Sequence, residues 1–438
     1  MGVEIAKVAR VVATKTAENR PPASERPSLL HPYCHLTDDA RESAPKKAAL
    51  AIERTDKAIH SMMDHKRFRS VKVAQRTIMT SVGPVTYRRR CYYDTFGERY
   101  IWPLDSLLGI SPRAKVSPEL KRIAVEKAAF MTYSLAGENC SAMGGISKST
   151  VCRAVRDAAV SEAARRSFAS AATVHLQIDE KYMGFCGSKR KRPRYTAAIH
   201  CGAVPVGKKG RKRLTKRTLL SAETPAKLAK KVNARLKRSY GIGLSDRIWV
   251  SGDLASYIRN FPERITCCES VYVPDKWHVC KAISDAYPEF GEMAPSAVQG
   301  IMDLIMEMGD LTRLAKANAL DLVKLYRKDP RCFERWSDPG YSGCSQEGMN
   351  SHYYAPRFAK LASRFKPSTV EKLCRIAEAR RNGERISISI KGKAPDDMEE
   401  LPWLGKAYED RMKYDIDTSR MEVGTRKAID SIRYGGLL

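Results

Sequence analysis

The fold is decided by the stretch Val174-His175-Leu176-Gln177-Ile178-Asp179-Glu180-Lys181-Tyr182-Met183. Apolar residues at positions 174, 176 and 178 alternate with polar ones, which is the period of a half-buried β-strand. Asp179 falls on the polar face, late in that strand. A solvated strand end would explain a single aspartate. A functional role for Asp179 is indicated only if other acidic residues of the chain accompany it.

Two further segments place acidic residues at the ends of expected elements. Arg247–Gly252 is a mostly apolar run followed directly by Asp253, and Gly343–Gly348 leads into an expected helix that begins near Glu347. Crowded carboxylates raise one another's pKa unless a cation offsets their charge, and Mg²⁺ prefers carboxylate oxygen. The sequence therefore predicts a site for two Mg²⁺ or Mn²⁺ ions, with Asp179, Asp253 and Glu347 as metal ligands and catalytic residues.

Several neighbours of these acids are further candidates. Glu180 competes with Asp179, but adjacent residues of a strand point to opposite faces, so we predict that only Asp179 binds metal. Asp275 and His278 follow an expected strand at 270–274, and Asn350 lies one helical turn beyond Glu347. We expect these three to support the ligands or contact DNA. For His278 the alternative is a packed, hydrogen-bonded residue.

The net charge of +29 over 438 residues indicates a polyanionic partner, of which nucleic acid is the commonest. No apolar run is long enough to span a bilayer and no secretory signal begins the chain, so we expect no membrane partner and a cytoplasmic, nucleoid-associated protein. The 12 cysteines are then expected to be free thiols. The group Cys267, Cys268, His278 and Cys280 could be a zinc site or buried thiols, although its spacing fits no standard zinc pattern.

Basic residues are concentrated in three places. Ser117-Pro118 begins expected helices over 118–131 and 132–142, and Gly144–Ser147 is an expected short turn before a third helix. This layout is typical of a helix-turn-helix reader, with a plain helical hairpin as the alternative. Basic runs at 189–194 and 208–213 lie in expected hairpins near Asp179. A run of charge is most often only a solvated face, but these two would suit phosphate contacts. The residues predicted to contact DNA are Lys148, Arg153, Arg156, Lys191, Arg192, Arg211 and Lys212.

From about residue 172 the pattern predicts an α/β fold. Strands are expected near 174–185, 194–204, 215–221, 246–252 and 270–274, with a helix over 224–239 between the third and the fourth. Strand–helix–parallel-strand connections return the chain beside an earlier strand. The strands of Asp179 and Asp253 should therefore be adjacent and end at the same sheet edge, with the helix of Glu347 packed across that edge.

The order and spacing of these motifs resemble the Lre-two family of bacterial insertion-sequence transposases, which is similar in layout to the Mutator-like transposases. The resemblance rests on Ile178-Asp179-Glu180, Gly252-Asp253-Leu254-Ala255, Asp275-Lys276-Trp277-His278 and Gly343–Gly348 with Ser351-His352, and spans about residues 70–385. It implies a ribonuclease-H-like mixed sheet with a helical insertion, preceded by a helical DNA-binding region, and a DDE triad of Asp179, Asp253 and Glu347.

With this resemblance the chain divides into seven expected segments. They are a mobile basic tail (1–42), a helix and β-hairpin region (43–116), a helix-turn-helix-like region (117–168), the first part of a ribonuclease-H-like core (169–285), a helical insertion (286–341), the last core helices (342–385) and a carboxy-terminal tail (386–438).

The function expected from these observations is that of a DDE transposase. It would cut the ends of an insertion sequence in double-stranded DNA and join them to target DNA, acting as a homo-oligomer on DNA. The alternatives are a catalytically idle or domesticated DNA-binding protein and a structure-specific nuclease that only cuts.

Overall fold

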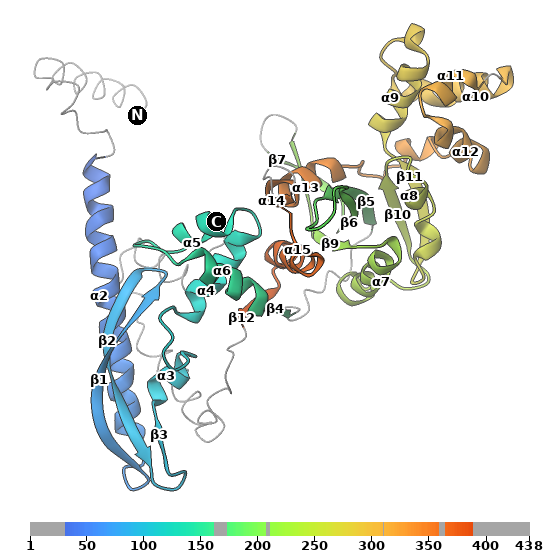
Figure 1. The fold of residues 1–438 in the computed structure, drawn as a ribbon. Helices are drawn as coiled ribbons and strands as arrows, with labels where there is room; N and C mark the ends of the chain where they lie inside the picture. Colours follow the sequence, from blue (N-terminus) through green and yellow to red (C-terminus); the bar gives the residue numbers. More distant parts are fainter. Residues whose placement is uncertain (1–30, 162–172, 207–210, 310, 359–363, 389–438) are drawn as a thin grey trace, which may run out of the picture. The chain divides into compact units, whose positions relative to one another are not determined.

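The computed structural model describes residues 31–161, 173–206, 211–309, 311–358 and 364–388 (Figure 1). The chain forms two compact units. Among the described residues, the first comprises 31–117 and Ser141–Gly144, and the second comprises Pro118–Cys140 and 145–388. The second unit contains all the predicted acidic residues.

The first unit joins a long helix, α2 (His31–Met62), to an antiparallel sheet of β1 (Phe68–Thr80), β2 (Gly83–Asp94) and β3 (Arg99–Ile101). The helix and β-hairpin predicted within 43–116 are therefore confirmed. The predicted tail over 1–42 is wrong from His31 onward, because that part is already helical; residues 1–30 lie outside the described part.

Three arginines of this hairpin form ion pairs within the unit. Arg89 and Arg76 both pair with Asp105 of the short helix α3 (Pro103–Leu107), and Arg90 pairs with Asp56 of α2. These ion pairs fix the two helices to the sheet, and the two aspartates offset part of the charge of the three arginines.

Three helices open the second unit: α4 (Pro118–Ala128), α5 (Tyr133–Glu138) and α6 (Lys148–Asp157). Ser147 caps α6, since its Oγ accepts the N–H of Thr150 at 3.3 Å, as such a residue does at a helix start. The helix predicted over 132–142 ends at residue 138. The link to α6 covers 139–147, so the expected short turn is wrong.

The central sheet has the order β11-β10-β5-β6-β9. Its five strands are β5 (Val174–Met183), β6 (Arg192–His200), β9 (Thr218–Ala222), β10 (Arg247–Gly252) and β11 (Glu269–Pro274). β5, β6 and β9 form an antiparallel meander, whereas β10 lies parallel to both β5 and β11. The predicted adjacency of the strands that precede Asp253 and carry Asp179 is confirmed, and both strands end at the same edge.

Helix α7 (Pro225–Arg235) and the π-turn η1 (Leu236–Tyr240) provide the crossover from β9 to β10. Their apolar residues share one core with Val174, Leu176 and Ile178, whose side chains are fully buried. One face of the sheet is thus an ordinary hydrophobic core, which explains the alternation seen in the sequence.

The opposite face of β5 is polar and is also buried. His175 and Gln177 have 1 % and 0 % of their surface exposed, and Ser251 of β10 and Thr196 of β6 are likewise buried. The expectation of a half-buried strand is therefore wrong over this part, because carboxy-terminal segments cover the polar face. Gln177 and Thr196 form hydrogen bonds to the covering segments, so this face holds its cover in a defined position.

The cover comes from α13 (Gln346–Tyr353), which contacts β5 and β6, and from α15 (Pro367–Asn382), which contacts β9; α14 (Ala355–Phe358) packs against α13. Asn382 completes the sheet edge at β9: its Oδ1 accepts the N–H of Leu219 and its Nδ2 donates to the Leu219 carbonyl, both at 2.8 Å. The side-chain amide thus supplies the pairing that another strand would supply, which protects an otherwise open edge.

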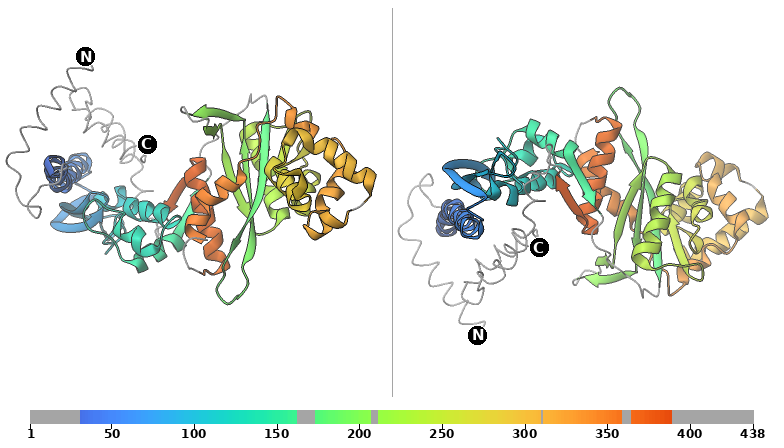
Figure 2. Two further views of the ribbon diagram at one scale, coloured as in Figure 1. Left: turned by 90° about the horizontal axis from the view of Figure 1, so that it is seen from above. Right: turned by 90° about the horizontal axis from the view of Figure 1, so that it is seen from below.

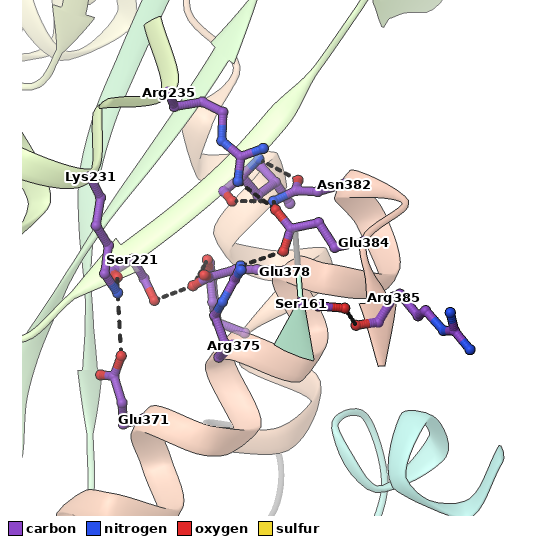
Figure 3. A network of polar contacts seen from close by, with 12 residues as sticks. Ser161, Ser221, Lys231, Arg235, Glu371, Arg375, Glu378, Asn382, Glu384 and Arg385 are labelled. Atoms are coloured by element: carbon purple, nitrogen blue, oxygen red, sulfur yellow. Dashed lines mark hydrogen bonds and ion pairs between the residues drawn. The ribbon is translucent and has the colours of Figure 1, made fainter. Parts of the chain in front are cut away.

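A network of charged groups fastens α15 to β9 and α7 (Figure 3). Ser221 donates to Glu378, while Glu371 pairs with Lys231 at 3.3 Å. Arg235 and Arg375 both pair with Glu384. Burial raises the pKa of Glu378. Glu378 and Glu384 are buried, so loss of their partners leaves a buried carboxylate unpaired, and the position of α15 depends on these two contacts more than on the exposed Lys231–Glu371 pair.

The predicted insertion is confirmed as helical. Between β11 and α13 the chain forms α9 (Lys276–Ala286), α10 (Val298–Met308), α11 (Thr312–Lys316) and α12 (Leu320–Lys328), with short 3₁₀ turns, and in Figure 1 α10–α12 lie beyond β11 and outside the sheet. A small outer sheet pairs β4 (Ala158–Ser161) with β12 (Arg385–Ile388). The described start of the predicted tail at 386 is therefore part of the fold.

Candidate active site

Three parallel strands bring three aspartates to one row at the carboxyl edge of the sheet. In the register, Ser251 is opposite Gln177, so Asp253 and Asp179, each two residues further, stand at the same level. Gly252 is opposite Pro274, and the N–H of Asp275 donates to the Gly252 carbonyl at 2.8 Å. Asp275, expected to support the ligands or contact DNA, thus stands at the same edge as the two predicted ligands.

Gly252 allows this close approach of β10 to β5. A Cβ atom at position 252 would collide with the carbonyl oxygen of Ile178 and with the side chain of Ile258. Only glycine leaves the backbones free to approach so closely. The residue before Asp253 therefore determines how near that aspartate lies to Asp179.

The carboxylate of Asp179 is largely enclosed. Its Oδ1 accepts the N–H of Glu180 at 2.7 Å, and its Oδ2 accepts from Nδ2 of Asn350 at 2.5 Å. Burial raises the pKa of Asp179 to about 6; the two hydrogen bonds oppose this rise, and the negative charges of Asp253 and Glu180 add to it. A carboxylate held beside like charges in this way is prepared to bind a cation.

Glu180 also takes part in the site. Its Oε2 accepts the hydroxyl of Tyr257, burial raises its pKa, and the charge of Asp253 contributes to that rise. Tyr257 in turn packs edge-to-face on Tyr195, with ring centroids 4.9 Å apart. Strand alternation predicted that Glu180 would point away from the site, but its carboxylate is within electrostatic range of Asp253. Glu180 is therefore a second candidate ligand beside Asp179.

Helix α13 is fixed over this edge by hydrogen bonds to β5 and β6. Asn350 donates to Asp179 and accepts from the Thr196 hydroxyl at 2.9 Å. Gln177 holds the segment before the helix: it donates to the Gly343 carbonyl at 2.9 Å and accepts from the N–H and hydroxyl of Ser345. Gln177 and Thr196 were not among the residues predicted from the sequence. The position of Gln177 could have identified it, because it precedes Asp179 by two residues and lies on the same face of the strand.

Glu347 is the second residue of α13 and precedes Asn350 by one helical turn. Its side chain lies outside the described part of the structure. Within the described residues, no group of three or more His, Cys, Asp or Glu side chains is arranged to hold a metal ion. The predicted packing of the helix across the edge is confirmed for its backbone, whereas the contribution of the Glu347 carboxylate stays a prediction.

Asn350→Ala is expected to weaken divalent-metal binding about 10–100-fold, because residues that orient ligands typically have effects of this size. The variant loses the donor to Asp179 and the bond to Thr196, and thereby the anchor of α13. Metal titration followed by calorimetry measures the effect, with the exposed Asn260→Ala as a control. Unchanged affinity in Asn350→Ala would contradict an orienting role.

Asp275 and His278 form a cap at the start of α9. Asp275 accepts the backbone N–H of His278 at 3.1 Å and lies 2.9 Å from its Nδ1. Burial acts to raise the pKa of Asp275, but the bonds from His278 outweigh it and hold that pKa below its usual value. The alternative of a hydrogen-bonded histidine is confirmed. Contact of either residue with metal or DNA stays a prediction.

The predicted DNA-contacting residues occupy different places. Lys148, Arg153 and Arg156 are exposed on α6. Lys191 and Arg192 are exposed at the β5–β6 hairpin, which extends beyond the level of Asp179. The last member of this basic run, Arg194, is instead buried and pairs with Glu371 at 2.6 Å.

The second basic run does not lie beside Asp179. Arg211 and Lys212 belong to β8 (Arg211–Leu214), which pairs with β7 (Ala203–Val206); their side chains lie outside the described part. Because β6 runs antiparallel to β5, it carries the chain away from the acids before this hairpin forms. Figure 2 shows the two hairpins at opposite ends of the sheet. The expectation that both basic runs flank Asp179 is therefore wrong.

The cysteines near His278 are free thiols, one buried and two partly exposed. Cys267 is buried, and burial raises the pKa of Cys268 to about 12 and also raises the pKa of Cys280. Thiols of high pKa stay protonated and bind metal poorly. His278 is paired with Asp275, so these four residues do not form the zinc site considered from the sequence.

In the described part of the chain, no helix has the length and apolar character needed to cross a bilayer. The model of an uncharacterised protein family, UPF0236, matches residues 40–303. This range includes β1 to β11 and the start of the helical insertion. No curated protein matches the chain.

Proposed function

This chain belongs to the uncharacterised protein family UPF0236, and we propose that it is a metal-dependent DNA transposase that cuts element ends and joins them to target DNA. One observation carries the proposal. Asp179, with its pKa raised to about 6, lies at the sheet edge beside Asp253 and is bonded to the helix that contains Glu347. Perturbed carboxylates that converge from several elements are typical of functional sites.

The sheet supports the finer interpretation of a ribonuclease-H-like core. An antiparallel meander of three strands is followed by a crossover helix and two strands parallel to the first. That order places the ends of the first and fourth strands together, as the resemblance to the Lre-two transposases requires. The position of α13 over β5 supports the same interpretation.

The residues at this edge fit hard divalent cations. The donors are carboxylate oxygens, which these cations prefer. The charges of Asp253 and Glu180 raise the pKa of Asp179, and a bound cation would offset them. Two Mg²⁺ or Mn²⁺ ions bound here would activate water or a 3′-hydroxyl and neutralise charge on the attacking and leaving oxygens. Asp179 and Asp253 would hold the ions, together with Glu347, while Asn350 fixes the orientation of Asp179. Asp275 would add negative charge to the same edge.

Exposed basic residues support binding to double-stranded DNA. Lys191 and Arg192 at the β5–β6 hairpin lie at the acidic end of the sheet, where phosphate contacts would hold a strand near the carboxylates. Arg153 and Arg156 on α6 would contact the terminal repeat. We include in the proposal a homo-oligomer on DNA and an association with the nucleoid, since synapsis of two element ends needs two active sites.

The proposal is tested with duplex fragments from both sides of the gene that encodes the chain, incubated with Mg²⁺, Mn²⁺ or a chelator and a target plasmid. We expect metal-dependent strand breaks and fragments joined to the plasmid. Asp253→Asn and Glu347→Gln should bind the fragments and cut none. Cutting without joining would identify a structure-specific nuclease, and binding without cutting by the wild type would identify a catalytically idle protein.

Arg153→Ala is expected to reduce binding to the cognate end more than binding to random duplex. By contrast, Lys191→Ala should weaken binding to the cognate end and to random duplex equally. It should also reduce the slope of the logarithm of the binding constant against the logarithm of salt concentration by the amount expected for about one phosphate contact. The physical reason is that base contacts specify sequence, whereas phosphate contacts only position the protein. Binding is measured at several salt concentrations on both duplexes. Equal losses for Arg153→Ala would contradict a reading role for α6.

A further inference from the structure

A small cavity lies between the crossover elements α7 and η1 and the covering helix α15. Its volume is about 250 Å³, which is below the range of about 300–1,000 Å³ found for sites of drug-sized ligands. Figure 3 shows Lys231 and Arg235 extending from α7 toward α15, which carries Arg375. The charged residues of the wall are Lys231, Arg235, Arg238, Arg375 and Glu378. The cavity therefore suits a small group of negative charge.

The basic side chains of this wall can be reached from solvent. Those of Lys231, Arg375 and Arg235 are 36 %, 27 % and 15 % exposed, and Arg238 is exposed. Glu378 is buried, and its Oε1 accepts hydrogen bonds from two hydroxyl groups of neighbouring elements. Burial also raises its pKa, which favours the neutral acid. A ligand in the cavity therefore meets cationic groups, while the one acidic group of the wall is enclosed.

The cationic groups keep donors for a ligand. Arg235 pairs with Glu384 through Nη2, and Arg375 pairs with it through Nη1 at 2.6 Å. Among the described residues, the other nitrogens of these two guanidinium groups have no partner, and they are not enclosed. Lys231 donates to two acceptors, which leaves one of its three N–H groups. Guanidinium donors form a planar fork that matches the oxygens of a phosphate group.

The surface around the cavity is also basic. In α7 and η1 no residue is acidic, and the basic ones are Lys227, Lys230, Lys231, Arg235, Lys237 and Arg238. The charged residues of α15 are Glu371, Lys372, Arg375, Glu378, Arg380 and Arg381. Basic residues thus exceed acidic ones on both sides of the cavity. A surface of one sign attracts ions of the opposite sign, so it raises the local concentration of anions.

We propose that this cavity binds one phosphate group, held by Lys231, Arg235 and Arg375. A phosphate group presents several acceptor oxygens in a small volume, which matches the converging donors. The backbone of a DNA strand and free phosphate are two sources of this group. The assignment to DNA rests on the proposed function, and it adds a contact on α7, where none of the DNA-contacting residues predicted from the sequence lies.

A bound phosphate would also strengthen the attachment of the cover to the sheet. It would join α15 to α7, which packs on β9. Tyr354, which directly follows α13, donates to Glu378 of α15 at 3.3 Å, and Asn350 of α13 donates to Asp179. One helix and two hydrogen bonds thus connect the cavity with the acidic edge. We therefore expect phosphate binding to raise the thermal stability of the full chain.

The inference is tested by calorimetric titration of the full chain with inorganic phosphate and with pyrophosphate. Salt at about 0.15 M screens weak binding to the rest of the surface. We expect one saturable site. Lys231→Ala and Arg375→Ala should each weaken binding about tenfold or more, because each removes a charged donor. In both variants the buried Glu384 keeps Arg235 as a partner, and thermal unfolding verifies that they fold.

Lys230→Ala is the matched control. It removes the same charge from the neighbouring exposed position of α7, which does not line the cavity, so phosphate affinity should stay unchanged. Absence of a saturable site in the wild type would overturn the inference. Unchanged affinity in both Lys231→Ala and Arg375→Ala would do the same, as would an equal loss in Lys230→Ala.

Binding of a random duplex at several salt concentrations distinguishes the two sources of phosphate. If Lys231→Ala and Arg375→Ala each reduce the dependence of binding on salt by about one phosphate contact, the ligand is a DNA backbone phosphate. Phosphate binding with an unchanged salt dependence identifies free phosphate as the ligand. If the wild type binds phosphate but cuts no DNA, the proposed function is wrong and the phosphate site stands. If it cuts DNA but binds no phosphate, only the present inference is wrong.

Discussion

Asp179→Asn will abolish metal-dependent DNA cleavage while raising the thermal stability of the metal-free protein. Cleavage should fall by at least about 10²–10³-fold, because the variant lacks a ligand charge that acts in the transition state. DNA binding should persist, since few phosphate contacts change. The neutral amide still fits the site: Asn350 can rotate its amide and Thr196 can accept from it.

The stability gain follows from the sign of the pKa shift. The folded chain raises the pKa of Asp179 from 3.8 to about 6, so the folded state binds this proton more tightly than the unfolded state. The residue's contribution to stability therefore decreases as pH rises through about 6, and above that pH the ionised carboxylate is unfavourable. Asp179→Asn removes this cost, on the order of 1–3 kcal/mol, and its advantage should vanish near pH 4.

Thermal unfolding of both proteins between pH 4 and 8 measures this effect, and cleavage is assayed in Mg²⁺. Asp285→Asn, with its side chain 54 % exposed on α9, is the control and should change neither quantity. Near-wild-type cleavage by Asp179→Asn would show that Asp179 is not a catalytic metal ligand. If Glu180→Gln instead abolished cleavage, the ligand would be Glu180, whose carboxylate is also influenced by Asp253.

Gly252→Ala should disrupt the site without changing any charge. The added methyl group would collide with the Ile178 carbonyl and with Ile258, forcing β10 away from β5 immediately before Asp253 and Asp179. Overpacking of this kind costs about 1–3 kcal/mol. A displacement of about 1 Å between reacting groups reduces rate about 10²-fold, so we expect a loss of cleavage larger than the fraction of unfolded protein explains.

Gly300→Ala is the matched control for this substitution. Gly300 lies in α10, and a methyl group there would meet no atom within 4 Å. Alanine should stabilise that helix by up to about 1 kcal/mol and leave cleavage unchanged. Circular dichroism gives the folded fraction and the cleavage rate is expressed per folded molecule. Full activity in Gly252→Ala would contradict the dependence of the site on close strand approach.

The sequence by itself determined the local elements and the strand ends. Alternation around Ile178 predicted β5, the apolar run before Asp253 predicted β10, and the crossover helix predicted that the two strands are adjacent and parallel. The strands follow from the period of apolar side chains, which a few consecutive residues define. Their adjacency follows from the single connection between them. The row of two aspartates followed from them.

Only the tertiary structure decided which groups surround that row. The bonds of Gln177 to Gly343 and of Asn350 to Asp179 join residues 166 and 171 positions apart, and no local pattern encodes such pairs. Burial of His175 and Gln177 on the polar face likewise requires the distant helices that cover it. The basic run at 208–213 lies at the end of the sheet opposite Asp179, because the antiparallel strand β6 reverses the direction of the chain. Closeness to a strand in the sequence therefore does not determine the end of the sheet at which a loop lies.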